Sequence, residues 1–191
     1  MKRLFIVSIL LALCAAMHCE AGTVTLSLAP NGGLITGLAG ATIGWDFTLA
    51  NDTSNWISAT NSALTFETNP LLGSYTDFIG PQGGPLPSFA VAPFSSWSQT
   101  LDLSNQLGLG SYTIDASAPI AAEDDGIVLV NFDIFNGDPT GTGQQTGNSS
   151  VSAPFSVIVT SAPTVPEPST LLLLGSGLVG FAGVIRPKRI S

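Results

Sequence analysis

Apolar and polar residues alternate along the middle of the chain, which is the pattern of half-buried β-strands. The alternation is clearest in four segments: 24–28, 43–49, 128–134 and 155–159. In the second of these, one face is formed by four apolar residues: Ile43, Trp45, Phe47 and Leu49. Weaker patterns predict four further strands, at 63–67, 74–79, 96–103 and 110–115.

Clusters of turn-forming residues separate these segments, at 30–33, 51–54, 80–87 and 136–150. Short strands joined by turns predict an all-β fold, a single antiparallel β-sandwich over residues 22–162. The segment Gly40–Ser58 looks like the strand–turn–strand opening of Ig-like domains, so the analogy is to an Ig-like sandwich. A disordered stalk is the competing interpretation. The aromatic residues at core positions and the 45% hydrophobic composition argue against it.

An uninterrupted apolar run near the N-terminus is typical of a secretory signal peptide. Two basic residues precede an almost wholly apolar stretch at 4–17, and Ala21 supplies the small residue before a cleavage site. We expect signal peptidase to cut between Ala21 and Gly22, which makes residues 1–21 a signal helix that is removed. An uncleaved anchor helix or a buried core helix is the alternative.

A second apolar run, the 15 uncharged residues at 171–185, lies near the C-terminus. It follows a proline-rich stalk at 163–170 and precedes a basic tail at 186–191. The tail contains three cations that act as a stop to membrane translocation: Arg186, Lys188 and Arg189. We therefore expect the tail to stay cytoplasmic. As a helix the run reaches about 22 Å, against a hydrocarbon core of about 30 Å. We therefore expect a short transmembrane helix of the kind that is inserted, recognised and then removed.

The triplet Pro166-Glu167-Pro168, followed at once by this apolar run and the basic cluster, resembles the PEP-CTERM protein-sorting signal. The resemblance implies export, membrane anchoring at the C-terminus and processing by an exosortase that recognises Pro166, Glu167 and Pro168. It also implies a bacterium that makes an exopolysaccharide matrix, with the processed protein at the cell surface or in that matrix. The body is similar to those of uncharacterised PEP-CTERM proteins. A plain C-terminal anchor is the alternative.

Charge is distributed very unevenly in this chain of 191 residues, whose formal net charge is −8. Residues 22–166 contain no Lys, Arg, His or Cys, but keep 11 of the 13 acidic residues, all except Glu20 and Glu167. That stretch therefore has no thiolate, no Ser–His pair and no imidazole or thiol ligand for zinc. Nucleic acid is not expected as a partner, because nothing basic would neutralise phosphates. These features predict a structural or interaction protein and not an enzyme.

The densest acidic group is Glu123-Asp124-Asp125. Several carboxylates in one loop suit a hard cation, so calcium is one interpretation. The spacing is not that of a calcium-binding loop, and a solvated turn before a strand at Ile127 is the other interpretation.

Two further candidates concern carbohydrate. Trp56 follows the turn at 51–54, so we expect it to be partly exposed and able to stack on a sugar. This makes a polysaccharide-binding module, with or without calcium, the first alternative function.

Asp46 and Asp133 lie at polar positions of two strands, and a pair of carboxylates can hydrolyse a glycoside. A carboxylate-pair hydrolase is therefore the second alternative.

Overall fold

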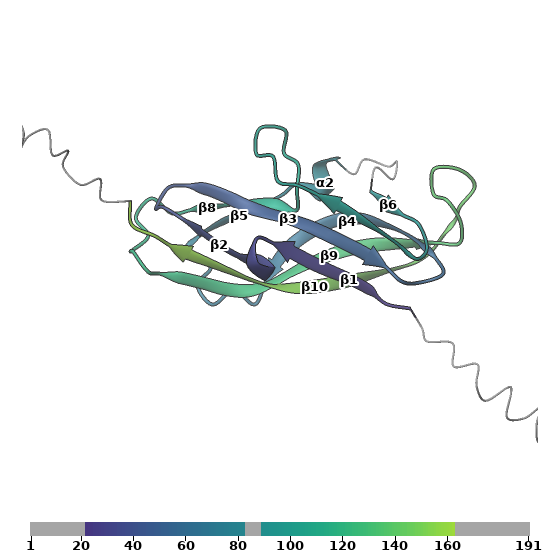
Figure 1. Ribbon diagram of the computed structural model, residues 1–191, viewed down its shortest axis with the longest axis horizontal. Coiled ribbons are helices and arrows are strands. Elements are labelled where there is room, and N and C mark those ends of the chain that lie inside the picture. Colours follow the sequence, from purple (N-terminus) through teal and green to yellow (C-terminus); the bar gives the residue numbers. More distant parts are fainter. Residues whose placement is uncertain (1–21, 83–88, 163–191) are drawn as a thin grey trace, which may run out of the picture. The chain divides into compact units, whose positions relative to one another are not determined.

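The strands form two sheets in the computed structural model, which describes residues 22–82 and 89–162 (Figure 1). The first sheet has the order β1-β3-β8-β5, and β7 also pairs with β3. Its strands are β1 (Val24–Ala29), β3 (Thr42–Asn51), β5 (Gly73–Asp77), β7 (Ser95–Gln99) and β8 (Gly110–Ile114). All of its pairs are antiparallel.

The second sheet has the order β2-β10-β9-β4-β6. Its strands are β2 (Leu34–Gly37), β4 (Trp56–Thr65), β6 (Ala90–Val91), β9 (Glu123–Phe135) and β10 (Gln145–Val159). Only β2 and β10 run parallel. A 3-10 helix, η1 (Asn31–Gly33), and a single helical turn, α2 (Ile79–Gln82), are the helical elements of the described residues. The predicted all-β, mainly antiparallel domain is confirmed.

The two sheets share one hydrophobic core. In β3 the side chains of Trp45, Phe47 and Leu49 are buried, and in β9 those of Val128, Val130 and Phe132 are buried, as the alternation predicts. The ring of Trp45, from the first sheet, meets the ring of Phe155, from the second, edge to face at 5.6 Å. Each fully buried side chain of this size contributes about 1.5–3 kcal/mol relative to an exposed one.

The chain changes sheet directly after β1. Residues 30–33 form the expected turn, which includes η1, and the next four residues form β2 in the other sheet. Gly33 has φ +103°, and a Cβ at that position would lie 2.4 Å from the carbonyl oxygen of Pro154. The Trp45 indole Nε1–H donates a 2.7 Å hydrogen bond to the Gly33 carbonyl. Only glycine fits this crossing point, and the buried indole fixes it.

Asp46 marks an interruption between β7 and β8. Both strands pair with β3 on the same side, and the residues between them, 100–109, leave the sheet opposite Asp46. The Leu101 N–H donates to Asp46 Oδ1 at 2.7 Å, and the Leu109 N–H donates to the Trp45 carbonyl at 3.1 Å. The predicted strand at 96–103 is therefore too long, because Asp46 supplies the acceptor that ends the ladder.

Three strands begin earlier along the chain than the sequence pattern predicted. β4 begins at Trp56, β9 begins at Glu123, and β10 begins at Gln145, inside the predicted turn at 136–150. In β10 the residues from Gln145 to Ser152 are mostly exposed, so they give no apolar alternation. Pairing with β9, not burial, makes them a strand.

The expected signal helix at 1–21 lies outside the described residues. So do the stalk at 163–170, the transmembrane helix at 171–185 and the basic tail at 186–191. Within the described ranges, no helix is long and apolar enough to span a bilayer.

Candidate functional site

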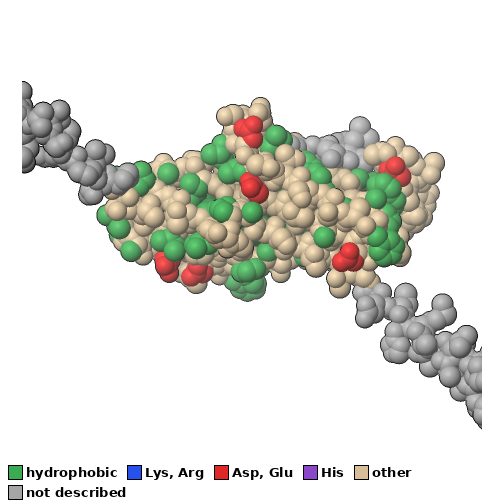
Figure 2. All heavy atoms as spheres, in the orientation of Figure 1, with side chains coloured by type: hydrophobic (Ala, Val, Ile, Leu, Met, Phe, Trp, Pro, Cys, Tyr) green, Lys and Arg blue, Asp and Glu red, His purple; other side chains and the backbone are tan. Residues whose placement is uncertain are grey.

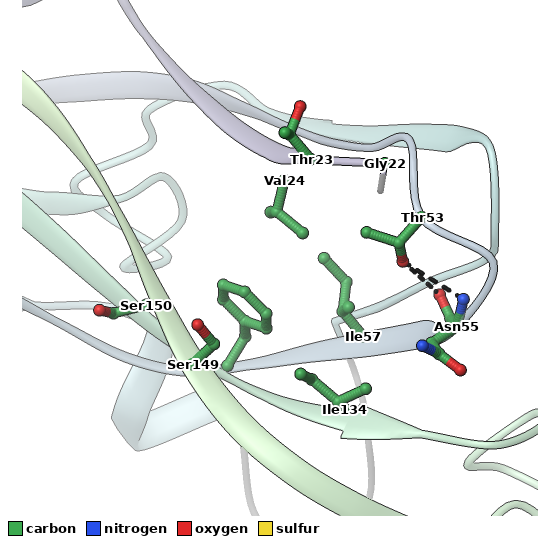
Figure 3. Close-up of a pocket in the computed structure, with 10 residues that line it drawn as sticks. Gly22, Thr23, Val24, Thr53, Asn55, Ile57, Ile134, Ser149 and Ser150 are labelled. Carbon is green, nitrogen blue, oxygen red and sulfur yellow. Dashed lines mark hydrogen bonds between the residues drawn. The ribbon is translucent and has the colours of Figure 1, made fainter. Parts of the chain in front are cut away.

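A pocket of about 310 Å³ opens between the start of β1 and the inner face of the second sheet (Figure 3). Its apolar floor is formed by four side chains from the strands β1, β4 and β9: Val24, Ile57, Phe132 and Ile134. Its rim carries hydroxyl and amide groups: Thr23, Thr53, Asn55, Ser149 and Ser150. We call it the Thr53–Asn55 pocket. None of its lining residues is charged, so it suits a neutral ligand with hydrogen-bonding groups on one side.

Asn51 holds the turn that forms one wall of this pocket. Its side chain is fully buried, and its Nδ2 donates to the carbonyls of Asn55, Val91 and Ala92 at 2.8, 3.2 and 3.0 Å. Its Oδ1 accepts from the Thr53 N–H at 3.1 Å and from the Thr53 hydroxyl at 2.7 Å. The turn at 51–54 is therefore fixed from inside, and the pocket is preformed on that side.

A second pocket of about 400 Å³ lies where β1 leaves the first sheet. Its walls are the ten residues Pro30, Asn31, Leu34, Ile35, Thr36, Thr42, Ile43, Gly44, Leu101 and Leu103. It too has no charged lining residue. The sequence pattern did not reveal either pocket, because each one joins segments that are distant along the chain.

The predicted sugar-stacking residue, Trp56, does not line either pocket. It is half-buried at the first position of β4, opposite Phe135 of β9. Its expected partial exposure is confirmed, whereas its contact with a sugar stays a prediction. The neighbouring Asn55 lies on the rim of the Thr53–Asn55 pocket, so Trp56 is close to it along the chain.

The acidic group Glu123-Asp124-Asp125 forms the first three residues of β9, so the interpretation as a solvated turn is wrong. Because strand residues alternate, Glu123 and Asp125 are exposed while Asp124 points inward and is fully buried. The three carboxylates thus do not share a face. Among the described residues, no group of three or more His, Cys, Asp or Glu side chains is placed to hold a metal ion. Calcium at Glu123, Asp124 and Asp125 stays a prediction.

Asp124 is instead bound from inside the domain. The Tyr112 hydroxyl donates to its Oδ2 at 2.9 Å, and the Asn69 N–H donates to its Oδ1 at 2.9 Å. Glu67 is a further neighbour. Burial, together with the nearby negative charge of Asp124, raises the pKa of Glu67 above its ordinary value. Burial likewise raises the pKa of Tyr112, and its hydrogen bond to Asp124 adds to the effect.

Asp46 and Asp133 are not brought together. Asp46 alternates with the core residues of β3, and Asp133 alternates with those of β9, so each lies on the outer face of a different sheet. Packed sheets are about 10 Å apart, and glycosidase carboxylates are about 5–9.5 Å apart. The core separates these two side chains. The hydrolase alternative therefore loses the pair on which it rested.

Comparison with protein families identifies the C-terminal segment. The family described as the PEP-CTERM protein-sorting motif matches residues 164–188. The chain carries a PEP-CTERM sorting signal. It is therefore an exported protein that is sorted by an exosortase and anchored in the membrane at its C-terminus before processing. The triplet Pro166-Glu167-Pro168 and the cations Arg186 and Lys188 fall inside the match, while Arg189 follows it.

Other comparisons add little to the PEP-CTERM match. Curated proteins give no match to this sequence. Among solved structures, a Vibrio cholerae protease, VesB, has a TM-score of 0.35 at 12% identity and covers 78% of this chain. A family 123 glycoside hydrolase from Clostridium perfringens has a TM-score of 0.28 at 12% identity and covers 73% of it. The chain spans only 35% and 28% of those two proteins, and likenesses this weak carry no argument.

The PEP-CTERM motif begins soon after the β-domain ends. The last strand, β10, ends at Val159, and the matched segment starts at residue 164. The terminal residues of β10 are secured on both edges, by β9 and by β2. Removal of the sorting segment therefore leaves the complete set of described strands in one piece.

Proposed function

We propose that this exosortase substrate is delivered to the cell surface or into an extracellular exopolysaccharide matrix, where its β-domain has a non-catalytic structural or interaction role. The observation that carries the proposal is the PEP-CTERM motif at 164–188, which follows the last strand of the β-domain closely in the sequence. Two features of the body support it. Residues 22–166 lack every cationic and thiol side chain, and Asp46 and Asp133 lie on different sheets.

The architecture also supports such a role. We infer that the two sheets form an Ig-like β-sandwich, because they share one core. In addition, the consecutive strands β1 and β2 lie at an edge of different sheets, β1 in the first and β2 in the second. A mature domain that begins at Gly22 has no cysteine, so its stability comes from this core and not from disulfides. We expect signal peptidase to produce that N-terminus. The apolar run at 171–185 serves as the transmembrane helix until the exosortase acts.

The sorting half of the proposal is tested by replacing Pro166, Glu167 and Pro168 with alanine in the native host. We expect the variant to keep its C-terminal segment and to accumulate in the membrane fraction, while the parent protein loses both terminal segments. The matched control replaces Ser161 and Pro163, which lie outside the matched motif, with alanine. Processing and delivery that are the same in the motif variant and in the parent would reject the proposal.

The readout is the intact mass of the protein in each cell fraction. Trypsin cannot map the body, because residues 4–185 contain no Lys or Arg. A mass that begins at Gly22 also tests the signal-peptidase site. Extra mass on the processed form indicates a covalent glycan or anchor.

A second candidate function is a polysaccharide-binding module. The observation that favours it is the Thr53–Asn55 pocket, where neutral hydrogen-bonding groups surround an apolar floor. Binding to the host's own polysaccharide, measured by calorimetry with and without calcium, tests this candidate. We expect Asn55→Ala and Trp56→Ala to weaken binding, with Asn105→Ala, in the exposed loop before β8, as the control. A flat titration of the parent protein under both conditions contradicts it.

A further inference from the structure

One side of the β-domain has no charged side chain in its strands. All 11 acidic residues of the body lie between Asp46 and Asp138, so the stretches 22–45 and 139–162 contain none. The fold brings these two stretches together. The first supplies β1 and β2, the second supplies β10, and β2 pairs with β10. Because only residues 30–33 link β1 to β2, the edges of both sheets meet on this side.

The charged side chains on the rest of the domain are all acidic, and this makes the three uncharged strands distinctive. No described residue is basic, so a second copy that approaches any acidic surface meets only like charge. Figure 2 shows one face of the molecule, where acidic side chains are separate spots and no basic side chain is present among the described residues. The strands β1, β2 and β10 carry no such charge themselves, although Asp133 of β9 is paired with Asn148 of β10, and the Asp52 N–H donates to the Thr23 carbonyl beside β1.

The strand β10 also presents an open edge on this side. It pairs with β9 from Gln145 to Ile158, but β2 covers its other edge only from Ser156 to Val159. The segment Gly147–Ala153 therefore has no strand hydrogen-bonded to that edge within the described part of the chain, and β1 lies nearby across the Thr53–Asn55 pocket. It contains no Lys, Asp, Glu or Pro, which are the residues that usually protect an edge strand from pairing with another chain.

We propose that a second copy of this chain pairs with this edge, β10 against β10 in antiparallel orientation about a two-fold axis near Ser150. In such an interface each residue faces its counterpart on the other side of the axis, and residues at the axis face themselves. Like charges directly opposite are destabilising, so an uncharged segment is the requirement for self-pairing. The edge strand β5 does not meet it, because Asp77 lies at its end.

This arrangement joins the β2-β10-β9-β4-β6 sheets of two molecules into one continuous sheet. It closes as a dimer and does not continue as a fibre, because the same surface is used on both copies. Ser149 and Ser150 also line the Thr53–Asn55 pocket, so the second copy lies at the wall of that pocket. The dimer goes beyond the proposed sorting function and does not depend on it.

Single-cysteine cross-linking tests the interface directly, because a chain that starts at Gly22 contains no native cysteine. Cysteine is placed in turn at positions 148, 149, 150, 151 and 152 of the full chain, expressed in its host and oxidised mildly. We expect a disulfide-linked dimer of the processed protein with its maximum at or next to Ser150→Cys. Directly opposite Cβ atoms are about 4.5–5.5 Å apart, which is close enough for a disulfide after small adjustments. The control is Ser74→Cys on β5, an exposed edge position on the charged side.

Sedimentation of the unmodified processed protein over a concentration series provides the independent measurement. We expect a monomer–dimer equilibrium that Ser150→Lys weakens by about tenfold or more at low salt, with Ser74→Lys unchanged. Equal thermal melting of Ser150→Lys and the parent shows that folding is intact. A parent protein that is monomeric throughout, or a cross-link at Ser74→Cys as strong as at Ser150→Cys, overturns the proposal. So does a monomer in which Ser150→Lys abolishes polysaccharide binding, which would assign this side to glycan.

Discussion

Tyr112 of β8 donates a 2.9 Å hydrogen bond to Oδ2 of Asp124 on β9, and so links the two sheets inside the core. Both side chains are fully buried. A buried acceptor of this kind depends on its donors, because water cannot replace them. Asp124 is therefore a structural residue, although the sequence placed it in a candidate cation site.

Removing the Tyr112 hydroxyl should destabilise the domain. In Tyr112→Phe the ring still fills its place, but Asp124 loses the donor at Oδ2 and keeps the Asn69 N–H at Oδ1. We expect a loss of about 1–3 kcal/mol in the free energy of unfolding, measured with urea. The double variant Tyr112→Phe/Asp124→Asn is measured for comparison, because it removes the buried carboxylate of Asp124 as well as the Tyr112 hydroxyl. An unchanged unfolding midpoint in Tyr112→Phe would show that the hydrogen bond is not important for stability.

Glu67 should make stability depend on pH. Its pKa is raised in the folded state above the ordinary value of 4.5, first by burial and then by the charge of Asp124. The folded state therefore binds more protons than the unfolded state just above pH 4.5, so stability falls as pH rises through this window. In Glu67→Gln the amide donates to Asp124 at every pH. We expect its melting temperature, relative to the parent, to be higher at pH 7 than at pH 4.

The control for this pH prediction is Glu123→Gln, which makes the same change of charge at an exposed position of β9. The comparison is made by thermal unfolding from pH 3.5 to 7.5 at constant ionic strength. A difference between Glu67→Gln and the parent that does not vary over this range would contradict the prediction.

Asn51 should contribute far more to the stability of the domain than its place in a turn sequence suggests. Asn51→Ala removes the donor to three carbonyls and the acceptor for the Thr53 N–H and hydroxyl. We expect a loss of about 2–3 kcal/mol, and weaker binding of any ligand to the Thr53–Asn55 pocket, whose turn is released. Asn148→Ala, at an exposed position of β10, should change stability by less than about 0.5 kcal/mol. Equal effects in the two variants would argue against this account.

The neighbouring glycines of η1 should respond differently to alanine. Both have positive φ, +68° at Gly32 and +103° at Gly33, but only at Gly33 does an added Cβ meet a backbone atom. Gly32→Ala should cost about 1 kcal/mol for the left-handed backbone alone. Gly33→Ala should cost about 2–4 kcal/mol, because it also displaces β10 at Pro154. Urea unfolding of the two variants decides the order, and a smaller loss in Gly33→Ala would refute it.

The strands that the sequence predicted correctly are those in which one face is apolar. Trp45, Phe47 and Leu49 alternate with Gly44, Asp46 and Thr48, and a strand half in the core needs that pattern. The strand β2 and the first part of β10 carry no such signal. β2 is four residues long, and Gln145–Ser152 is mostly exposed, so both exist because a neighbouring strand supplies hydrogen bonds.

The candidate sites show the same limit of prediction from local sequence. Asp124 stands between two exposed acids, and nothing local distinguishes it from them. Its burial depends on the Tyr112 hydroxyl, which reaches it from the other sheet. The Thr53–Asn55 pocket likewise joins β1, β4, β9 and β10, and no single segment of sequence contains its chemistry.

By itself the sequence determined what is encoded locally: the PEP-CTERM signal, the alternation of the main strands and the absence of cations in the body. Each of these features depends only on residues that are close together in the sequence. The tertiary structure alone decided which of the acids is buried, where the pockets lie, and that two uncharged stretches more than 90 residues apart form one side of the domain. Strand pairing decides these features, because it connects residues by hydrogen bonds and not by their order in the chain.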